Sequence, residues 1–149
     1  MRTQRFHSYT PAEGHGLAHD PLNAIVGPRP IAWVGTRSVS GILNLAPFSF
    51  FNLFSYEPPV LIFSAVGSKK DTIVNVQETG EFTWNIVTRE LAEQMNLSCI
   101  EEPVDEFAFA KLSPLTGEVV AAPRVAESPI SMECKVLSCE QLRDLDGVL

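Results

Sequence analysis

The stretch Ala46–Pro59, APFSFFNLFSYEPP, contains four phenylalanines and a tyrosine. Between the rings lie Ser49, Asn52 and Ser55, at intervals of three residues. A strand that only builds a core needs apolar side chains on one face, because successive side chains alternate between the two faces of a sheet. Two interpretations follow. The stretch is a buried strand with scattered polar groups, or it presents rings and hydrogen-bonding groups together to a ligand.

The segments around this stretch have the pattern of further strands. Ile31–Val34 is a short continuous apolar run, and a turn at Ser40–Gly41 links it to the quoted stretch as an antiparallel hairpin would. After the Pro-Pro pair, Val60–Val66 predicts a third, fully apolar strand. Residues 81–88 and 130–142 alternate apolar and polar side chains, so each predicts another strand.

Helical spacing is confined to short segments. One helix is expected between a cap at Ser68 or Asp71 and a stop at Gly80. A second is expected from Thr88 through Met95, and a short piece around 107–112. Many strands, few helices and hairpin links predict a largely antiparallel barrel with helices packed outside it.

The composition suits one globular domain, with residues 1–24 as a polar arm and 25–149 as the folded part. The net charge of -7 disfavours a nucleic-acid or anionic-membrane surface. The sequence has no run of about 18 apolar residues, so it predicts no membrane-spanning segment. Three cysteines without a C-x-x-C motif favour reduced thiols in the cytoplasm, and Cys134 fits a core position. The Asp146–Gly147 turn near the end predicts a missing strand, hence a C-terminal truncation or an edge covered by a partner.

Two places have the chemistry of an anion site. Gly67–Thr72, GSKKDT, combines lysines and hydroxyls with a helix start, where free N–H groups favour anions. Arg29, between two prolines, is held in an extended backbone from which its guanidinium can bind a phosphate. Solvated surface charge is the alternative in both cases.

The sequence contains no acid–base constellation. There is no G-x-G-x-x-G or G-x-S-x-G motif, and the three histidines are interpreted as solvated residues of the arm. Glu101–Glu102 and Asp105–Glu106 are interpreted as a solvated acidic loop. If the protein is an enzyme, a cofactor therefore carries its chemistry.

Five segments taken together resemble the flavin reductase-like, FMN-binding split-barrel family. They are PRPIAWVGT (28–36), GILNLAPFSFFNLFSYEPPVLIFS (41–64), KDTIVNVQETGEFTWNIV (70–87), MNLS (95–98) and PRVAESPISMEC (123–134). The resemblance implies a mainly β, antiparallel Greek-key split barrel with a few peripheral helices. It also implies a homodimer that holds FMN near the interface and reduces flavin with NADH or NADPH.

The resemblance further implies which residues bind the cofactor, while no catalytic residue and no metal is expected. Beside the flavin would lie Arg29, Pro30, Ile31, Ala32, Trp33 and Thr36. Along the isoalloxazine ring, largely through backbone groups and Ser49, would lie Ala46, Pro47, Phe48, Ser49, Phe50, Phe51 and Asn52. Around the ribityl phosphate would gather Ser64, Lys70, Asp71 and Thr72, and Asn96 would approach the flavin.

Two alternatives to a reductase stay open. One is an FMN-binding electron-transfer module that a protein partner reduces, without NAD(P)H activity. The other is a truncated, ligand-free dimerisation domain.

Overall fold

The computed structural model describes residues 6–66 and 70–143. Along the chain its elements are α1 (Leu22–Ile25), β1 (Ala32–Arg37), β2 (Leu43–Phe48), β3 (Phe50–Tyr56), β4 (Pro59–Ser64), α2 (Asp71–Thr79), β5 (Glu81–Asn85), the 3-10 helix η1 (Arg89–Leu91), α3 (Ala92–Leu97), α4 (Glu106–Phe109), β6 (Pro114–Leu115), β7 (Arg124–Val125) and β8 (Ser131–Lys135). The expected cap at Ser68 and the Asp146–Gly147 turn lie outside the described residues.

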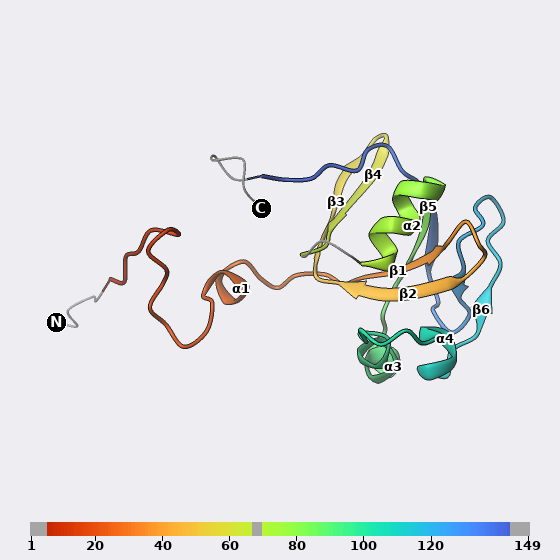
Figure 1. The fold of residues 1–149 in the computed structure, drawn as a ribbon, viewed down its shortest axis with the longest axis horizontal. Helices are drawn as coiled ribbons and strands as arrows, with labels where there is room; N and C mark the ends of the chain where they lie inside the picture. The colour runs from red at the N-terminus through yellow and green to blue at the C-terminus, as the bar shows by residue number, and fades with distance from the viewer. Residues whose placement is uncertain (1–5, 67–69, 144–149) are drawn as a thin grey trace.

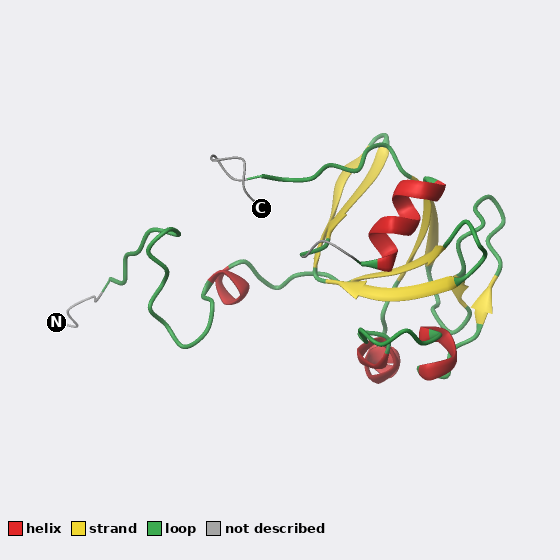
Figure 2. Cartoon of the chain, in the orientation of Figure 1, coloured by secondary structure: helices red, strands yellow, loops and turns green. Residues whose placement is uncertain are grey.

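A four-stranded antiparallel sheet in the order β2-β1-β5-β8 forms the centre of the molecule (Figures 1 and 2). The predicted hairpin of β1 and β2 is confirmed. Its turn closes where the Gly41 N–H donates to the Ser38 carbonyl at 2.9 Å. Gly41 has a φ of +92°, a conformation that residues with a Cβ adopt only under strain.

The quoted stretch is two strands and not the single strand that the pattern predicts. The chain leaves the central sheet after Phe48, which pairs with Ala32, and continues from Phe50, which pairs with Ser64 in the separate β3–β4 hairpin. Ser49 is the corner between them. A strand that contributes to two sheets has to bend where it changes from one to the other.

Both faces of the central sheet are buried, as the continuous apolar run in β1 predicts. Trp33 packs on one side against α3 and α4 residues, including Phe107. Ala32 and Val34 face the other side, where the β3–β4 hairpin and α2 cover the sheet. Because side chains alternate along a strand, β1 supplies two cores at once. Cys134 packs against the second core, as expected.

The helices lie near their predicted places, but the single helix expected from Thr88 through Met95 is η1 followed by α3, and α1 was not expected. Gly80 ends α2 in the left-handed region, with a φ of +69°. Lys70 is the N-cap residue of α2, without a side-chain cap bond, so Asp71 is the first helical residue and not the cap. Asp105 caps α4 by accepting the Ala108 N–H at 3.1 Å. No helix in the described part of the chain is long and apolar enough to cross a membrane.

Two more features of the fold differ from the expectations or were absent from them. Glu106 is buried and accepts the Leu45 N–H at 3.4 Å, so it is not part of a solvated acidic loop. Burial raises the pKa of its carboxyl group. The β6–β7 hairpin was not predicted, because strands of two residues are too short to show a periodic pattern.

Candidate functional site

Strand pairing brings many of the predicted site residues to one corner of the molecule. Ala32, at the start of β1, lies opposite Phe48 at the end of β2. One residue past the corner, Phe50 at the start of β3 lies opposite Ser64 at the end of β4. We call this region the strand corner and define it as residues 29–33, 46–52 and 64. Segments far apart in the sequence meet here because four strands begin or end at the same place (Figure 1).

One face of the β3–β4 hairpin turns outward at this corner. Phe50 and Asn52 share that face because they are two residues apart, and Ser64 joins them as the cross-strand partner of Phe50. The Arg29 guanidinium carbon lies 5.1 Å from the centroid of the Phe50 ring, a cation–π contact. Arg29 Nη1 donates to the Asn23 carbonyl at 3.0 Å, whereas its buried Nε has no hydrogen-bond partner.

The other rings of the corner face the core. Phe48 packs against Phe63 with ring centroids 5.2 Å apart, and Phe51 stacks on Trp84 at 5.8 Å. Phe50 is therefore the most exposed ring of the stretch Phe48–Phe51, with 44% of its surface exposed, while Phe51 is half-buried and Phe48 is buried. Ala32 is buried, and Ala46 and Pro47 in β2 are half-buried.

Trp33 lies wholly inside the first core. Its indole Nε1 donates to Ser98 Oγ at 2.9 Å, and that hydroxyl donates to the Met95 carbonyl at 2.8 Å. Trp33 has no accessible surface, so the structure does not present it to a ligand at the corner. Asn96, which was predicted to approach the flavin, is exposed on α3, an element separate from the strands of the corner.

The N-terminus of α2 supplies the positive charge of the predicted phosphate site. Lys70 Nζ lies 3.2 Å from Glu101 Oε1, and both side chains are accessible to solvent. An exposed ion pair of this kind is worth at most about 1 kcal/mol, so a phosphate can replace the carboxylate at little cost. Asp71 is exposed in the first turn. The helix dipole adds a positive potential at this end.

A buried polar network ties this helix to the central sheet. Asn44 Nδ2 donates to Thr36 Oγ1 at 3.2 Å and to Thr72 Oγ1 at 2.9 Å. Asn75 Nδ2 donates to the same Thr36 oxygen at 3.0 Å. Thr36 and Thr72 are almost entirely buried, so their hydroxyls hold the helix in place before any ligand binds. The sequence patterns did not single out Asn44 as a functional residue, although its polar side chain between Leu43 and Leu45 was a signal that could have done so.

An apolar cavity of about 460 Å³ adjoins the strand corner. Its wall contains Pro30 and Ile31, two of the predicted site residues. The remaining wall comes from β5 and the segment after it: Trp84, Ile86, Val87, Thr88, Arg89 and Ala92. Its size falls in the range of small-molecule sites, roughly 300 to 1,000 Å³.

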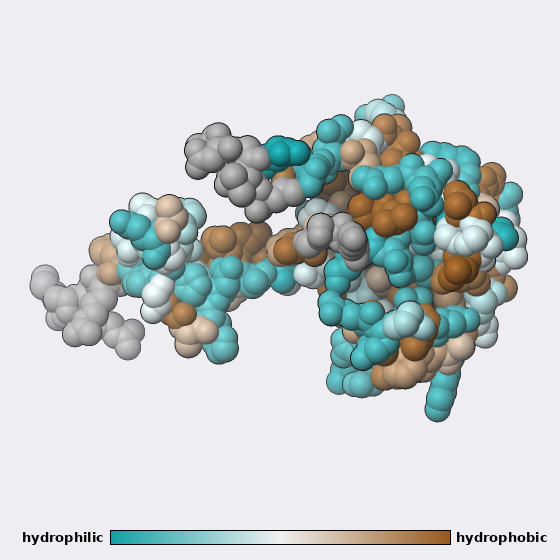
Figure 3. All heavy atoms as spheres, viewed as in Figure 1, coloured by the Kyte–Doolittle hydropathy of each residue, from teal (hydrophilic) through white to brown (hydrophobic). Residues whose placement is uncertain are grey.

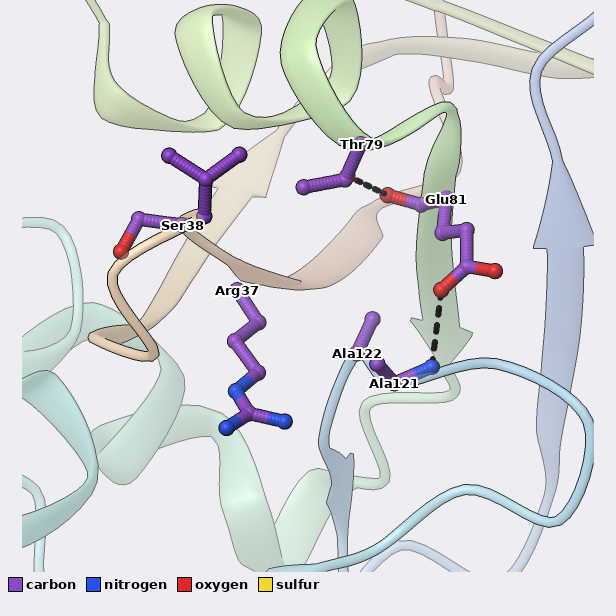
Figure 4. Close-up of a pocket in the computed structure, with 7 residues that line it drawn as sticks. Arg37, Ser38, Thr79, Glu81, Ala121 and Ala122 are labelled. Atoms are coloured by element: carbon purple, nitrogen blue, oxygen red, sulfur yellow. Dashed lines mark hydrogen bonds between the residues drawn. The ribbon is translucent and has the colours of Figure 1, made fainter.

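A second cavity, of about 280 Å³, contains none of the predicted residues (Figure 4). Arg37 and Ser38 line it where β1 ends, together with the Ala121–Ala122 loop. Glu81 belongs to this wall and accepts the Ala121 N–H at 2.8 Å. Bonds from Lys135 and from Ala121 hold the pKa of Glu81 below its usual value. No cluster of histidine, cysteine and acidic residues that could hold a metal occurs within 6–66 and 70–143.

Comparison with known proteins identifies the family. The model of the flavin reductase like domain matches residues 27–147. The chain belongs to the flavin reductase-like family. The mainly β split-barrel fold that the sequence predicts for it is confirmed, since solved structures of such folds superpose on this chain.

The flavin reductase-like chain has relatives of known sequence and known structure. An uncharacterized protein from Aquifex aeolicus is 46% identical over 127 residues, which are 81% of this chain and 65% of that protein. Nitrilotriacetate monooxygenase component B from Bacillus cereus is 31% identical with a TM-score of 0.79, over 91% of this chain and 70% of that one. Flavoredoxin of Desulfovibrio vulgaris is 28% identical with a TM-score of 0.71, and the match covers 76% of this chain and 63% of that one. This chain spans 52% to 65% of the length of the curated relatives.

Proposed function

We propose that this flavin reductase-like chain binds FMN without a covalent bond at the strand corner and oxidises NADH or NADPH. Residues of the strand corner would hold and orient the FMN, which would supply the redox chemistry of hydride uptake from the nicotinamide donor. The observation that carries the proposal is the convergence of residues 29–33, 46–52 and 64 at one corner of a chain in this family.

The corner has the groups that a flat, polar-edged ring requires. The exposed Phe50 ring offers an apolar contact, and Ser49 and Asn52 offer hydrogen bonds beside it. The unpartnered Nε of Arg29 offers a further donor. Buried donors are almost always paired in proteins, so this one supports a ligand acceptor at the corner.

The phosphate end of the cofactor would lie at the start of α2. Lys70 would exchange its pairing with Glu101 for the phosphate, aided by the helix dipole. Thr72 is buried and accepts a hydrogen bond from Asn44, so we assign it the role of fixing the helix start. The chain itself would bind and orient the cofactor and the donor, and none of its side chains needs to act as a proton-transfer base.

The test is a flavin titration followed by an activity assay. FMN added to the purified protein is expected to bind with quenched flavin fluorescence, and the loaded protein is expected to oxidise NADH or NADPH. Ser49→Ala and Phe50→Ala should each weaken FMN binding by about tenfold. A protein that binds no FMN, or that shows no flavin-dependent NAD(P)H oxidation, would contradict the proposal.

A second candidate is an electron-transfer module that a protein partner reduces. The likeness to flavoredoxin of Desulfovibrio vulgaris favours it. This function predicts a yellow protein that binds FMN as tightly as the reductase would but does not oxidise NAD(P)H. Photoreduced protein that passes electrons to an added acceptor, without NAD(P)H oxidation, would decide for it.

We also propose that the exposed face of the β3–β4 hairpin joins two copies of the chain. Its apolar side chains are exposed to solvent, with Phe54 76% and Tyr56 82% exposed. Figure 3 shows hydrophobic, brown atoms reaching the surface among teal ones near the tip of this hairpin. Apolar patches of this kind are uncommon on monomers. Size-exclusion chromatography with light scattering should give a dimer mass, and Phe54→Glu should give the monomer mass. A monomeric wild-type protein would refute this interface.

Two further parts of the proposal concern the whole chain. The division into an arm of residues 1–24 and a flavin-binding domain of residues 25–149 stays a prediction, as does the cytoplasmic location. Limited proteolysis of the FMN-loaded protein is expected to remove the arm and leave FMN bound.

A further inference from the structure

Glu101 occupies the lysine that the proposed cofactor site would offer to a phosphate. Its Oε1 lies 3.2 Å from Lys70 Nζ, at the start of α2. The two side chains differ in exposure, since solvent reaches 43% of the lysine side chain and 88% of the glutamate side chain. Because the glutamate keeps most of its hydration within the ion pair, its carboxylate can leave the lysine without a large change in solvation.

The loop that carries Glu101 is anchored at both ends. At its start the hydroxyl of Ser98 accepts the N–H of the buried Trp33 indole at 2.9 Å. At its end Asp105 caps α4 with its side chain. A group on a short tether is present beside its partner at an effective concentration of about the millimolar order. Glu101 is therefore an internal competitor that an external anion has to displace from Lys70.

Further carboxyl groups lie near the same helix start. Asp71 is the first residue of α2 and is exposed. Burial, and to a smaller extent the charges of Asp105 and Asp71, raise the pKa of Glu106, so these carboxyl groups are close enough to repel one another. Negative charges beside a phosphate weaken its binding. A site that only had to retain a phosphate would gain from neutral residues here, so the acidic surroundings indicate a ligand that has to leave again.

We propose that Glu101 is an internal competitor for the phosphate of the cofactor, and that this competition keeps FMN exchangeable. Without flavin the Glu101 carboxylate neutralises Lys70. A flavin that carries a phosphate dianion displaces the carboxylate, whereas a flavin without a phosphate leaves the ion pair in place. The inference rests on the proposed function, because it concerns the regulation of the same site.

The size of the effect follows from the fraction of protein in which Lys70 is free. An exposed ion pair favours its paired state by about two- to fivefold. The apparent affinity of a ligand is reduced by the fraction of protein that is competent to bind it. Glu101→Gln should therefore lower the dissociation constant for FMN by about three- to sixfold and leave that for riboflavin unchanged. At roughly 1 M NaCl the difference should disappear, because the Debye length falls to about 3 Å.

The first experiment titrates the wild-type chain and four variants with FMN and with riboflavin and follows the quenching of flavin fluorescence. Glu102→Gln is the matched control. It removes the same charge from the same loop, and the exposed Glu102 side chain makes no ion pair within residues 6–66 and 70–143. Lys70→Ala, alone and combined with Glu101→Gln, completes a double-mutant cycle. Direct competition predicts that Glu101→Gln has no effect on FMN binding once the lysine is removed.

The second experiment uses inorganic phosphate, so that the competition is measured without any flavin. Thermal unfolding of the wild type, Glu101→Gln and Glu102→Gln is followed as phosphate rises, with NaCl adjusted to hold the ionic strength constant. An anion that binds the folded protein raises its melting temperature in proportion to the occupancy of the site. Glu101→Gln should reach a given rise in melting temperature at about three- to sixfold less phosphate, and Glu102→Gln should match the wild type.

The two probes separate this inference from the proposed function. Equal phosphate responses in the wild type and Glu101→Gln would overturn the inference, and so would an equal gain in Glu102→Gln or a gain in FMN affinity that persists without Lys70. The expected phosphate response in a protein that binds no FMN would support the competition at Lys70 and contradict the FMN site. FMN-dependent oxidation of NAD(P)H with equal FMN affinity in the wild type and Glu101→Gln would support the reductase and contradict the competition.

Discussion

Replacing Asn44 by alanine tests the link between the buried polar network and cofactor binding. Asn44 is 6% exposed and its Nδ2 makes two hydrogen bonds, to Thr36 and to Thr72. Each bond contributes about 1 kcal/mol net, and a buried oxygen left without its donor costs about 1–3 kcal/mol more. Because Thr36 keeps its bond from Asn75, the added penalty falls mainly on Thr72. The two lost bonds and the penalty at Thr72 together give an expected loss of about 3–5 kcal/mol.

The assay is thermal and urea unfolding of the flavin-free protein, followed by flavin titration. For a chain of this size, that loss lowers the melting temperature by roughly 10–15 °C. Because Thr72 lies in the first turn of α2, FMN affinity should also fall by about tenfold, while affinity for riboflavin, which lacks the phosphate, should not change.

The control is Asn23→Ala, an exposed position whose side chain makes no hydrogen bond within residues 6–66 and 70–143 and whose backbone carbonyl, which the substitution keeps, accepts from Arg29. It should unfold like the wild type. A melting temperature within about 1 °C of wild type for Asn44→Ala would refute the energetic argument. An equal loss of FMN and riboflavin affinity would refute the assignment of this network to the phosphate end.

Three further predictions concern stability and reactivity. Burial raises the pKa of Glu106 above its usual 4.5, so ionisation of this carboxyl group destabilises the folded protein as pH rises. Glu106→Gln should therefore raise the melting temperature at pH 7, and the difference from the wild type should vanish near pH 4. A variant that melts at the wild-type temperature at pH 7 as well as at pH 4 would contradict this. Burial is the main reason that the pKa of the Cys134 thiol is raised to about 11. At pH 8 a thiol reagent should therefore modify the exposed Cys99 and Cys139 before Cys134, and equal modification rates at the three cysteines would contradict this. A methyl group on Gly35 would meet the Pro123 carbonyl oxygen and the Thr83 hydroxyl, so Gly35→Ala should cost about 3 kcal/mol or prevent folding, and a urea midpoint like that of wild type would show that the strands yield.

Much of the site was visible in the sequence because local rules govern it. The helix that starts beside Lys70 and ends at Gly80 follows from spacing and a terminal glycine, and the strand after it follows from alternation. The division of APFSFFNLFSYEPP between two sheets was not predictable in this way. Each part is an apolar run that suits a strand, and the two parts go to different sheets because their partners, β1 and β4, differ.

The sequence by itself determined which chemical groups this protein has: rings and hydroxyls in one stretch, lysines at a helix start, and strand patterns on both sides. Only the tertiary structure decided how those groups are used. It turned Phe48 and Phe51 inward and Phe50 outward, bonded the buried Thr72 to Asn44, and brought Trp84 and Ile31 into the wall of one cavity. The physical reason is that a side chain's burial depends on strand pairing and packing between segments distant in the chain, and local patterns carry no information about those partners.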